Sequence, residues 1–241
     1  MTRLTTRFER KYLLDQAQYH QVRNELRLQM TSDGYTRQGG GNYLVRSLYY
    51  DTRDYSAFHE RNDGNFGRIK LRVRSYSEQA EPDQPISVEI KTKKGNAMEK
   101  FACLVGLNDY HNFQTCRRWA CPDNEVTNEF ERLYRVRMMV PVLLIQYRRE
   151  GYRTRDGSPL RVTLDQNISS ARASRLFPEN LLLKPHRPKN VVLEIKSTAA
   201  CEPEWLQHLV RRHGLKMTAN SKYVQGIEII RPNMVTPGPV A

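Results

Sequence analysis

Residues 68–76, RIKLRVRSY, alternate cationic and aliphatic side chains with a period of two. Successive side chains of a β-strand point to opposite faces, so this segment predicts a strand with one apolar face and one row of positive charge. Four cations occupy the charged row: Arg68, Lys70, Arg72 and Arg74. The alternative is a half-buried strand whose solvated face happens to be basic. The other strands of the chain have to decide between the two.

Charged residues share one face in five further strand-like segments. These are Glu9 with Lys11, Glu89 with Lys91, Tyr147 with Arg149, Arg161 with Thr163 and Asp165, and Glu194 with Lys196. If the sheet closes into a barrel, these faces line a tunnel, whereas an ordinary half-exposed sheet would present the same mixture to solvent. A lumen of like charges repels itself when empty. A polyanion would stabilise it, and its few acids could hold a divalent metal against phosphate oxygens.

The order of predicted elements indicates an α+β protein. Strands are expected at residues 4–14, 43–51, 66–76, 85–93, 98–105, 141–152, 158–166 and 190–197, with a hairpin turn at Gly95–Asn96. Helices are expected at 15–30, within 107–138 and at 202–214, and a flexible connection at 36–43. Sequential hairpins favour a closed antiparallel β-barrel tunnel of about eight strands with flanking helices. We expect one domain over 1–230 and a disordered tail over 231–241.

Bulk charge points to an anionic partner. The formal net charge is +13, which suits nucleic acid, an anionic membrane surface or a polyanionic small molecule. Nucleic acid is disfavoured because the strands show no aromatic stacking platform. No apolar run is long enough to cross a bilayer, no signal-peptide core is evident, and the four cysteines form no CxxC pair, so a cytoplasmic protein is expected. The six histidines show no metal-ligand spacing, and no glycine-rich phosphate loop is found.

The chain resembles the CYTH-like triphosphate tunnel superfamily and, within it, the polyphosphate polymerase domain of the vacuolar transporter chaperone (VTC) family. The resemblance is carried, in family order over residues 7–227, by RFERKYLL, VRSLYYDT, RIKLRVRSY, SVEIKTKK, EKFACLV, YRREGY, LRVTLD, VVLEIK and NSKYVQGI. It implies an eight-stranded antiparallel tunnel. It also implies transfer of the γ-phosphate of ATP to a growing polyphosphate chain with Mn²⁺ or Mg²⁺.

The resemblance also implies roles for individual residues. Basic residues that match those gripping the triphosphate or the chain are Lys11, Arg72, Arg74, Lys91, Arg149, Arg161 and Lys222. Further contacts with substrate are expected from Glu9, Arg68, Lys70, Lys100, Tyr147, Lys196 and Ser221. Glu194 matches the carboxylate that holds the metal.

Two departures from the family pattern bear on the reaction. Hydrolytic members open with ExExK, whereas this chain has Arg7 in place of the first glutamate, which favours the polymerase branch. Ala219 stands where the polymerase pattern often has a second lysine, so binding of polyphosphate is a firmer expectation than catalysis. A hydrolase of the same fold and a non-catalytic polyphosphate- or nucleotide-binding module remain as alternatives. No SPX domain or membrane helix is found in the chain, so any link to translocation would need a membrane-protein partner.

Overall fold

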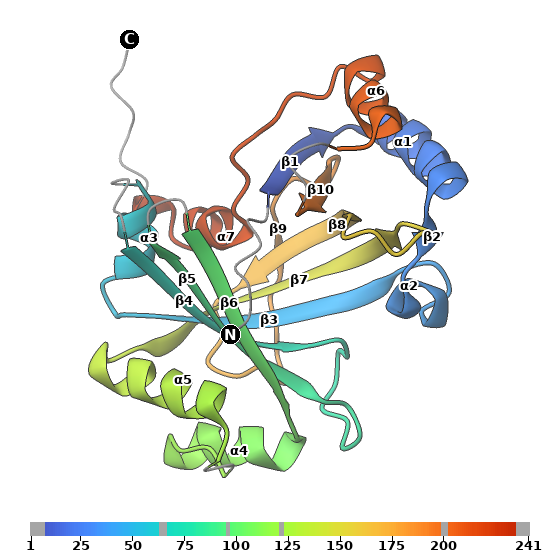
Figure 1. The fold of residues 1–241 in the computed structure, drawn as a ribbon. Coiled ribbons are helices and arrows are strands. Elements are labelled where there is room, and N and C mark those ends of the chain that lie inside the picture. Colours follow the sequence, from blue (N-terminus) through green and yellow to red (C-terminus); the bar gives the residue numbers. More distant parts are fainter. Residues whose placement is uncertain (1–7, 63–66, 95–96, 121–122, 199–201, 235–241) are drawn as a thin grey trace. The chain divides into compact units, whose positions relative to one another are not determined.

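The computed structural model describes residues 8–62, 67–94, 97–120, 123–198 and 202–234 (Figure 1). Eight main strands form an antiparallel sheet in the order β1-β10-β8-β7-β3-β4-β5-β6. Their bounds are β1 Phe8–Leu14, β3 Tyr43–Asp51, β4 Gly67–Ser75, β5 Ile86–Lys94, β6 Ala97–Val105, β7 Val140–Arg153, β8 Arg161–Ala171 and β10 Val191–Ser197. Two short strands, β2 (Thr31–Ser32) and β9 (Lys184–Pro185), pair with β7 and β8. The strands expected from the sequence are confirmed, except that residues 4–7 of the first expected strand lie outside the described residues.

The chain divides into two compact units. Unit 1 comprises residues 1–44, 147–168 and 187–221, and unit 2 comprises residues 45–146, 169–186 and 222–241. Strands β3, β7 and β8 each contribute residues to both units. The single domain expected over 1–230 stays a prediction.

Unit 1 contains β1 and β10 with helices α1 (Gln16–Gln29), α2 (Gly34–Gln38) and α6 (Glu204–Arg212). Helix α1 begins at a capping box, in which Asp15 accepts a hydrogen bond from the Gln18 amide and the Gln18 side chain accepts one from the Asp15 amide. The predicted start of this helix at Asp15 is confirmed. Helices α1 and α6 pack on the aliphatic face of β1, β8 and β10, burying Val22, Leu193 and Leu206.

Unit 2 contains β4, β5 and β6 with helices α3 (Ser56–Asn62), α4 (Leu107–Cys116), α5 (Glu125–Val136) and α7 (Lys222–Ile230), and the 3-10 helix η1 (Pro232–Met234). Helices α4 and α5, which the sequence predicted within 107–138, cover the aliphatic face of β3, β4 and β5. Phe113 and Phe130 are fully buried there against Leu71. Since that face is taken by the core, the charged side chains of the same strands lie on the other face of the sheet.

Helix α7 packs very closely against β7 and β8. A Cβ atom at Gly226 would lie 2.7 Å from Ser170 Oγ and 2.8 Å from Leu143 Cδ2, so only glycine lets the helix come this near. The approach fixes the first turn of α7, where Tyr223 packs on Tyr49 with ring centroids 5.4 Å apart. Helix α7 therefore lies against the charged-face side of unit 2.

The prediction of a closed barrel is wrong, because β1 and β6 are the two ends of the strand order. The outer edge of β1 is instead bonded to a downstream segment: Tyr12 is bridged to Met217, and the Thr218 amide donates to the Lys11 carbonyl at 2.8 Å. Strand β6 leaves Phe101 and Leu104 exposed at the other end.

Three local expectations also need correction or lie outside the described residues. Part of the connection expected at 36–43 is helical, because Asp33 caps α2 by accepting from the Thr36 amide. Helices α3 and α7 were not predicted. The turn expected at Gly95–Asn96 and residues 235–241 of the expected tail lie outside the described residues, and Pro232–Met234 of that tail form η1.

Candidate functional site

The charged side of unit 2 is organised by the register of its strands. Directly opposite residues form three rows across the sheet: Ser47, Arg74 and Ser87; Tyr49, Arg72 and Glu89; Lys70, Lys91 and Lys100. Opposite side chains in an antiparallel pair lie within reach of one another, and like charges at such positions are destabilising. The row of three lysines is therefore a site that favours an anion.

Among the described side chains, β4, β5 and β6 carry many more cations than acids on this side. The cations are Arg68, Lys70, Arg72, Arg74, Lys91 and Lys100. The single carboxylate among them is Glu89. We call these seven residues, together with Ser47, Tyr49 and Ser87, the basic face of unit 2. The alternation seen in the sequence is confirmed as a shared face.

Glu89 is the centre of this face. Its buried carboxylate accepts hydrogen bonds from Arg72 Nε and Nη2 at 2.9 and 2.6 Å and forms an ion pair with Lys100 Nζ at 3.0 Å. Arg74 Nη1 lies 3.8 Å away. Burial by itself would raise the pKa of Glu89, but the three cations hold it well below its usual range. Burial lowers the pKa of Lys100, with Glu89 opposing the shift. One carboxylate thus serves three cations.

Tyr49 is a member of this face that the sequence analysis did not assign. Its hydroxyl accepts a hydrogen bond from Arg72 Nη1 at 2.9 Å. Burial would raise the pKa of Tyr49, but Arg72, Arg74 and Lys70 lower it from 10.0 to about 8. Lys70 Nζ lies 4.9 Å from the centroid of the neighbouring Tyr223 ring. Tyr49 could have been assigned from the segment YLVRSLYYD, because it lies two residues after Ser47 and therefore shares the same face of the strand.

Tyr49 is expected to lose its proton at about pH 8, and this can be followed by the ultraviolet absorbance of the phenolate. Because the pKa is lower in the folded than in the unfolded protein, the unfolded state holds more protons between about pH 8 and pH 10. Folding stability from this group is therefore fully present above pH 10 and is lost as the pH falls through about 8. Tripolyphosphate should raise the pKa, since the anion neutralises the cations. Tyr49→Phe serves as the control that removes the transition, and a transition that survives in it would contradict the assignment.

The charged side of unit 1 has a different balance. The register places Lys11 opposite Glu194, and Glu194 opposite Thr163. It also places Lys196 between Glu9 and Arg161. Lys11 Nζ lies 2.7 Å from Glu9 Oε1, and Lys196 Nζ lies 2.6 Å from Glu194 Oε1. In unit 1, each of these two lysines therefore forms an ion pair with a glutamate.

Arg149 and Asp165 form a buried, two-pronged ion pair in unit 1. Arg149 Nε and Nη2 donate to the two Asp165 oxygens at 2.6 and 2.8 Å. Burial would lower the pKa of Arg149, yet Asp165 and the nearby Tyr147 and Glu194 raise it well above its usual range. The guanidinium carbon lies 5.2 Å from the centroid of the Tyr147 ring. Two of the five donors of Arg149 are thus committed to the protein itself.

Arg161 is anchored by a loop residue. Its Nη2 donates to Asp33 Oδ2 at 3.0 Å and to the Tyr43 hydroxyl at 3.3 Å. Burial would raise the pKa of Asp33, but hydrogen bonds from Thr36 and the charge of Arg161 lower it. Arg161 Nε is buried without a hydrogen-bond partner. This donor is a candidate for a ligand oxygen.

The carboxylates of unit 1 fit a divalent cation that also binds substrate. Mg²⁺ and similar ions in phosphate chemistry use one or two carboxylates, with phosphate oxygens and waters completing the shell. Glu194 and Glu9 lie on one face, and the buried Thr163 Oγ1 next to Glu194 has no hydrogen-bond partner. Within the described residues no group of three or more acidic, histidine or cysteine side chains could enclose a metal. The donor set therefore suits a metal shared with phosphate, not a closed protein cage.

The last two predicted residues lie where unit 1 passes into unit 2. Ser221 is the final residue of unit 1, and Lys222 is the first residue of α7. Lys222 precedes Tyr223, which contacts Tyr49 and Lys70 in unit 2. The structure thus brings six predicted residues together on the basic face of unit 2. It brings Glu9, Lys11, Arg161, Glu194 and Lys196 together on adjoining strands of unit 1.

Comparison with known proteins adds a family and a fold. Residues 6–231 match the family model described as VTC domain. A protein from Bacillus halodurans, provisionally assigned as an adenylate cyclase, has a TM-score of 0.56 at 13% identity, over 91% of this chain and 97% of that one. One from Hippeastrum, described as having a dominant triphosphatase activity, has a TM-score of 0.54 at 12% identity, over 95% and 97%. At such identities the similarity shows the fold alone. No curated protein matches the chain.

None of the helices that the structure describes is both long enough and apolar enough to span a membrane.

Proposed function

Because the chain belongs to the VTC domain family of CYTH-like triphosphate tunnel proteins, whose members process triphosphates, we propose that it is a polyphosphate polymerase. It would transfer the γ-phosphate of ATP to a growing polyphosphate chain with Mn²⁺ or Mg²⁺. The observation that carries the proposal is the basic face of unit 2, where six cations share one face of the sheet with a single carboxylate. Phosphoryl transfer depends on positioning and on neutralising charge on phosphate oxygens, which is what such a face supplies.

The cations of unit 2 have complementary tasks in this proposal. Arg72 and Arg74 present planar guanidinium groups that bind phosphate in bidentate fashion, whereas lysines supply compact charge. The lysine row of Lys70, Lys91 and Lys100 would hold successive phosphates, and Lys222 would extend it from α7. Arg68, at the start of β4, would contact the polyphosphate chain. The Tyr49 hydroxyl, which accepts a hydrogen bond from Arg72, would donate one to a phosphate oxygen.

The residues of unit 1 would bind both substrate and metal. Lys11, Lys196, Arg161 and Arg149 are its proposed phosphate ligands, with the hydroxyls of Tyr147 and Ser221 as further donors. Glu194, supported by Glu9 and Thr163, would hold the divalent ion, which supplies charge neutralisation at phosphate oxygens when bound. In the reaction an oxygen of the terminal chain phosphate forms a bond to the γ-phosphorus, and the bond from that phosphorus to the bridging oxygen of ADP breaks. The attacking oxygen is already anionic, so no protein nucleophile is needed.

Hydrolysis of a triphosphate is the second candidate. The Hippeastrum protein of the same fold is described as a triphosphatase, and Glu9 and Glu194 are carboxylates of the kind that a metal-assisted attack of water requires. A binding module without turnover is the third candidate, because the basic face would bind triphosphate whether or not catalysis follows.

One incubation distinguishes the three candidates. Purified protein is supplied with ATP and Mn²⁺, and the products are resolved by size. Long-chain polyphosphate with ADP supports the polymerase, free phosphate without polymer supports the hydrolase, and unchanged ATP with saturable binding supports the binding module. Either of the last two results overturns the proposal.

Glu194→Gln tests the metal role. The substitution keeps the size of the side chain and removes its charge, so manganese-dependent synthesis should collapse. Metal-free triphosphate should bind as well as before or better, because a like charge has gone. The readouts are product formation and calorimetric binding of tripolyphosphate without metal.

Glu150→Gln is the matched control for this variant. Glu150 is a buried carboxylate of the same unit, but it lies on the other face of β7 and accepts hydrogen bonds from Arg23 and Tyr152. The Glu150→Gln variant should be less stable, but its synthesis of polyphosphate should still depend on manganese. If Glu194→Gln still synthesises polyphosphate with manganese, the proposed metal role of Glu194 is wrong, and its role is that of an ion-pair partner of Lys196.

A further inference from the structure

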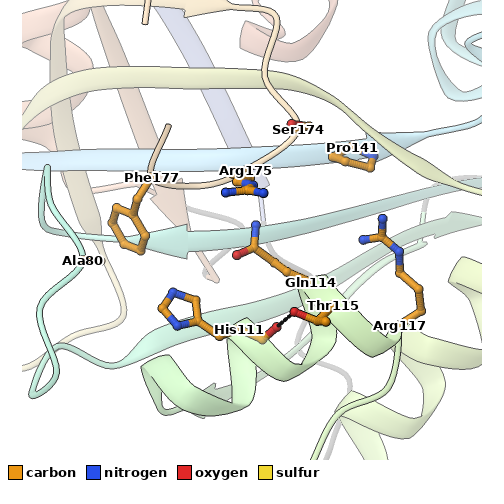
Figure 2. Close-up of a pocket in the computed structure, with 9 residues that line it drawn as sticks. All are labelled: Ala80, His111, Gln114, Thr115, Arg117, Pro141, Ser174, Arg175 and Phe177. Atoms are coloured by element: carbon orange, nitrogen blue, oxygen red, sulfur yellow. Dashed lines mark hydrogen bonds between the residues drawn. The ribbon is translucent and has the colours of Figure 1, made fainter. Parts of the chain in front are cut away.

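A cavity in unit 2 lies apart from the basic face. Its volume is about 700 Å³, and it is bordered by helix α4, the segment 174–177 that follows β8, and the start of β7 (Figure 2). Helix α4 packs on the aliphatic side of the sheet, which is the side opposite the basic face. The cavity is therefore separate from the site proposed above, and its volume is within the range of about 300–1,000 Å³ that is usual for small-molecule sites.

The lining of this cavity is cationic. Arg117, Arg175 and His111 border it, and no carboxylate is found among its lining residues. Figure 2 shows the guanidinium of Arg175 above the amide of Gln114, with the His111 ring beside them. A concave surface with two guanidinium groups and no acid attracts an anion. Because arginine forks match phosphate oxygens in shape, phosphate is the favoured anion.

Gln114 adds a donor that has no partner in the protein. Its Nε2 is buried and makes no hydrogen bond. A buried amide donor without an acceptor costs free energy, so such groups are normally satisfied by protein, water or ligand. The side chain extends from α4 toward Arg175, so a small rotation that turns the amide into the cavity would let a bound oxygen accept from it (Figure 2).

Arg117 occupies an uncommon backbone conformation at the rim of the cavity. It ends α4 with φ 59° and ψ 28°, in the left-handed region where helices usually place glycine. Its amide donates to the Phe113 carbonyl at 2.9 Å, which fixes this geometry. A side chain kept at a position that favours glycine is consistent with a use for its guanidinium.

We propose that this cavity binds an organic phosphate that carries a flat ring, such as a nucleotide. Arg175, Arg117 and Gln114 donate to the phosphate oxygens. Phe177, at one end of the cavity, provides an apolar face for a flat ring (Figure 2). This site is independent of the polymerase proposal, since it shares no residue with the basic face of unit 2.

AMP is the probe, because it carries one phosphate and one flat ring. Calorimetry on the full chain should show saturable binding of AMP that is tighter than binding of inorganic phosphate. Arg175→Gln and Gln114→Leu should each weaken AMP binding, the arginine variant by about tenfold or more, as expected for the loss of a charge-assisted hydrogen bond. Neither should change the affinity for tripolyphosphate, which reports on the basic face.

Arg172→Gln is the matched control, because Arg172 is an exposed arginine three residues before Arg175 that is not among the lining residues of the cavity. It should leave AMP binding unchanged. The proposal is overturned if AMP does not bind, if AMP binds no tighter than inorganic phosphate, or if Arg175→Gln binds AMP as the unaltered protein does. It is also overturned if Arg72→Gln, on the basic face, weakens AMP binding as much as Arg175→Gln.

Discussion

Replacing Arg149 by methionine is expected to lower the free energy of unfolding by about 3–5 kcal/mol, because the buried Asp165 carboxylate would lose the opposite charge and both hydrogen bonds that Arg149 supplies. Asp165 is completely inaccessible to solvent, and both of its oxygens accept from Arg149. Urea denaturation measures the loss. Arg148→Met is the matched control, since Arg148 is the exposed neighbour on the same strand and should change stability little.

The double variant Arg149→Met/Asp165→Leu separates stability from binding. Replacing both members of a buried ion pair by apolar groups is often neutral, so most of the lost stability should return. Binding of tripolyphosphate should stay weakened, because the guanidinium proposed to contact phosphate is absent. If the double variant binds as tightly as the unaltered protein, Arg149 has a structural role alone. If the single variant is fully stable, the ion pair contributes nothing.

Glu89→Gln should destabilise the ligand-free protein by about 3 kcal/mol or more at low ionic strength, because the cations on its face would lose their common partner. Nitrogen atoms of Arg72, Arg74 and Lys100 lie 2.6, 3.8 and 3.0 Å from the oxygens of this carboxylate. Tripolyphosphate should then raise the melting temperature of the variant more than that of the unaltered protein, since the anion replaces the missing charge. Added salt should reduce both effects.

The acid dependence of stability provides a second measurement on Glu89. Its pKa is depressed in the folded protein, so its contribution to stability is present above the unfolded value of 4.5 and is lost as the pH falls toward the folded value. Glu89→Gln should therefore flatten the loss of stability in acid. Glu129→Gln, which breaks an exposed pair with Arg132, is the control and should change little. Equal stabilisation of Glu89→Gln and the unaltered protein by tripolyphosphate would mean that the anion does not bind beside Glu89.

Several features of the fold could be predicted from short segments. The alternation in RIKLRVRSY is a property of one strand, and Leu71 and Val73 are indeed buried while Arg72 lies on the other face. The start of α1 was equally accessible, because a capping box needs only residues three positions apart. Helix α7 was missed although its sequence is apolar, since its position depends on Gly226 meeting β7 and β8.

The two-residue period of each strand was enough to predict which side chains share a face. It did not determine what those side chains contact. The bond of Thr218 to the outer edge of β1, the commitment of Arg149 to Asp165 and the lowered pKa of Tyr49 all join residues distant in the chain. Such contacts depend on strand order, register and burial. The open sheet and the contact of Glu89 with three cations therefore became known from the folded chain and not from its sequence.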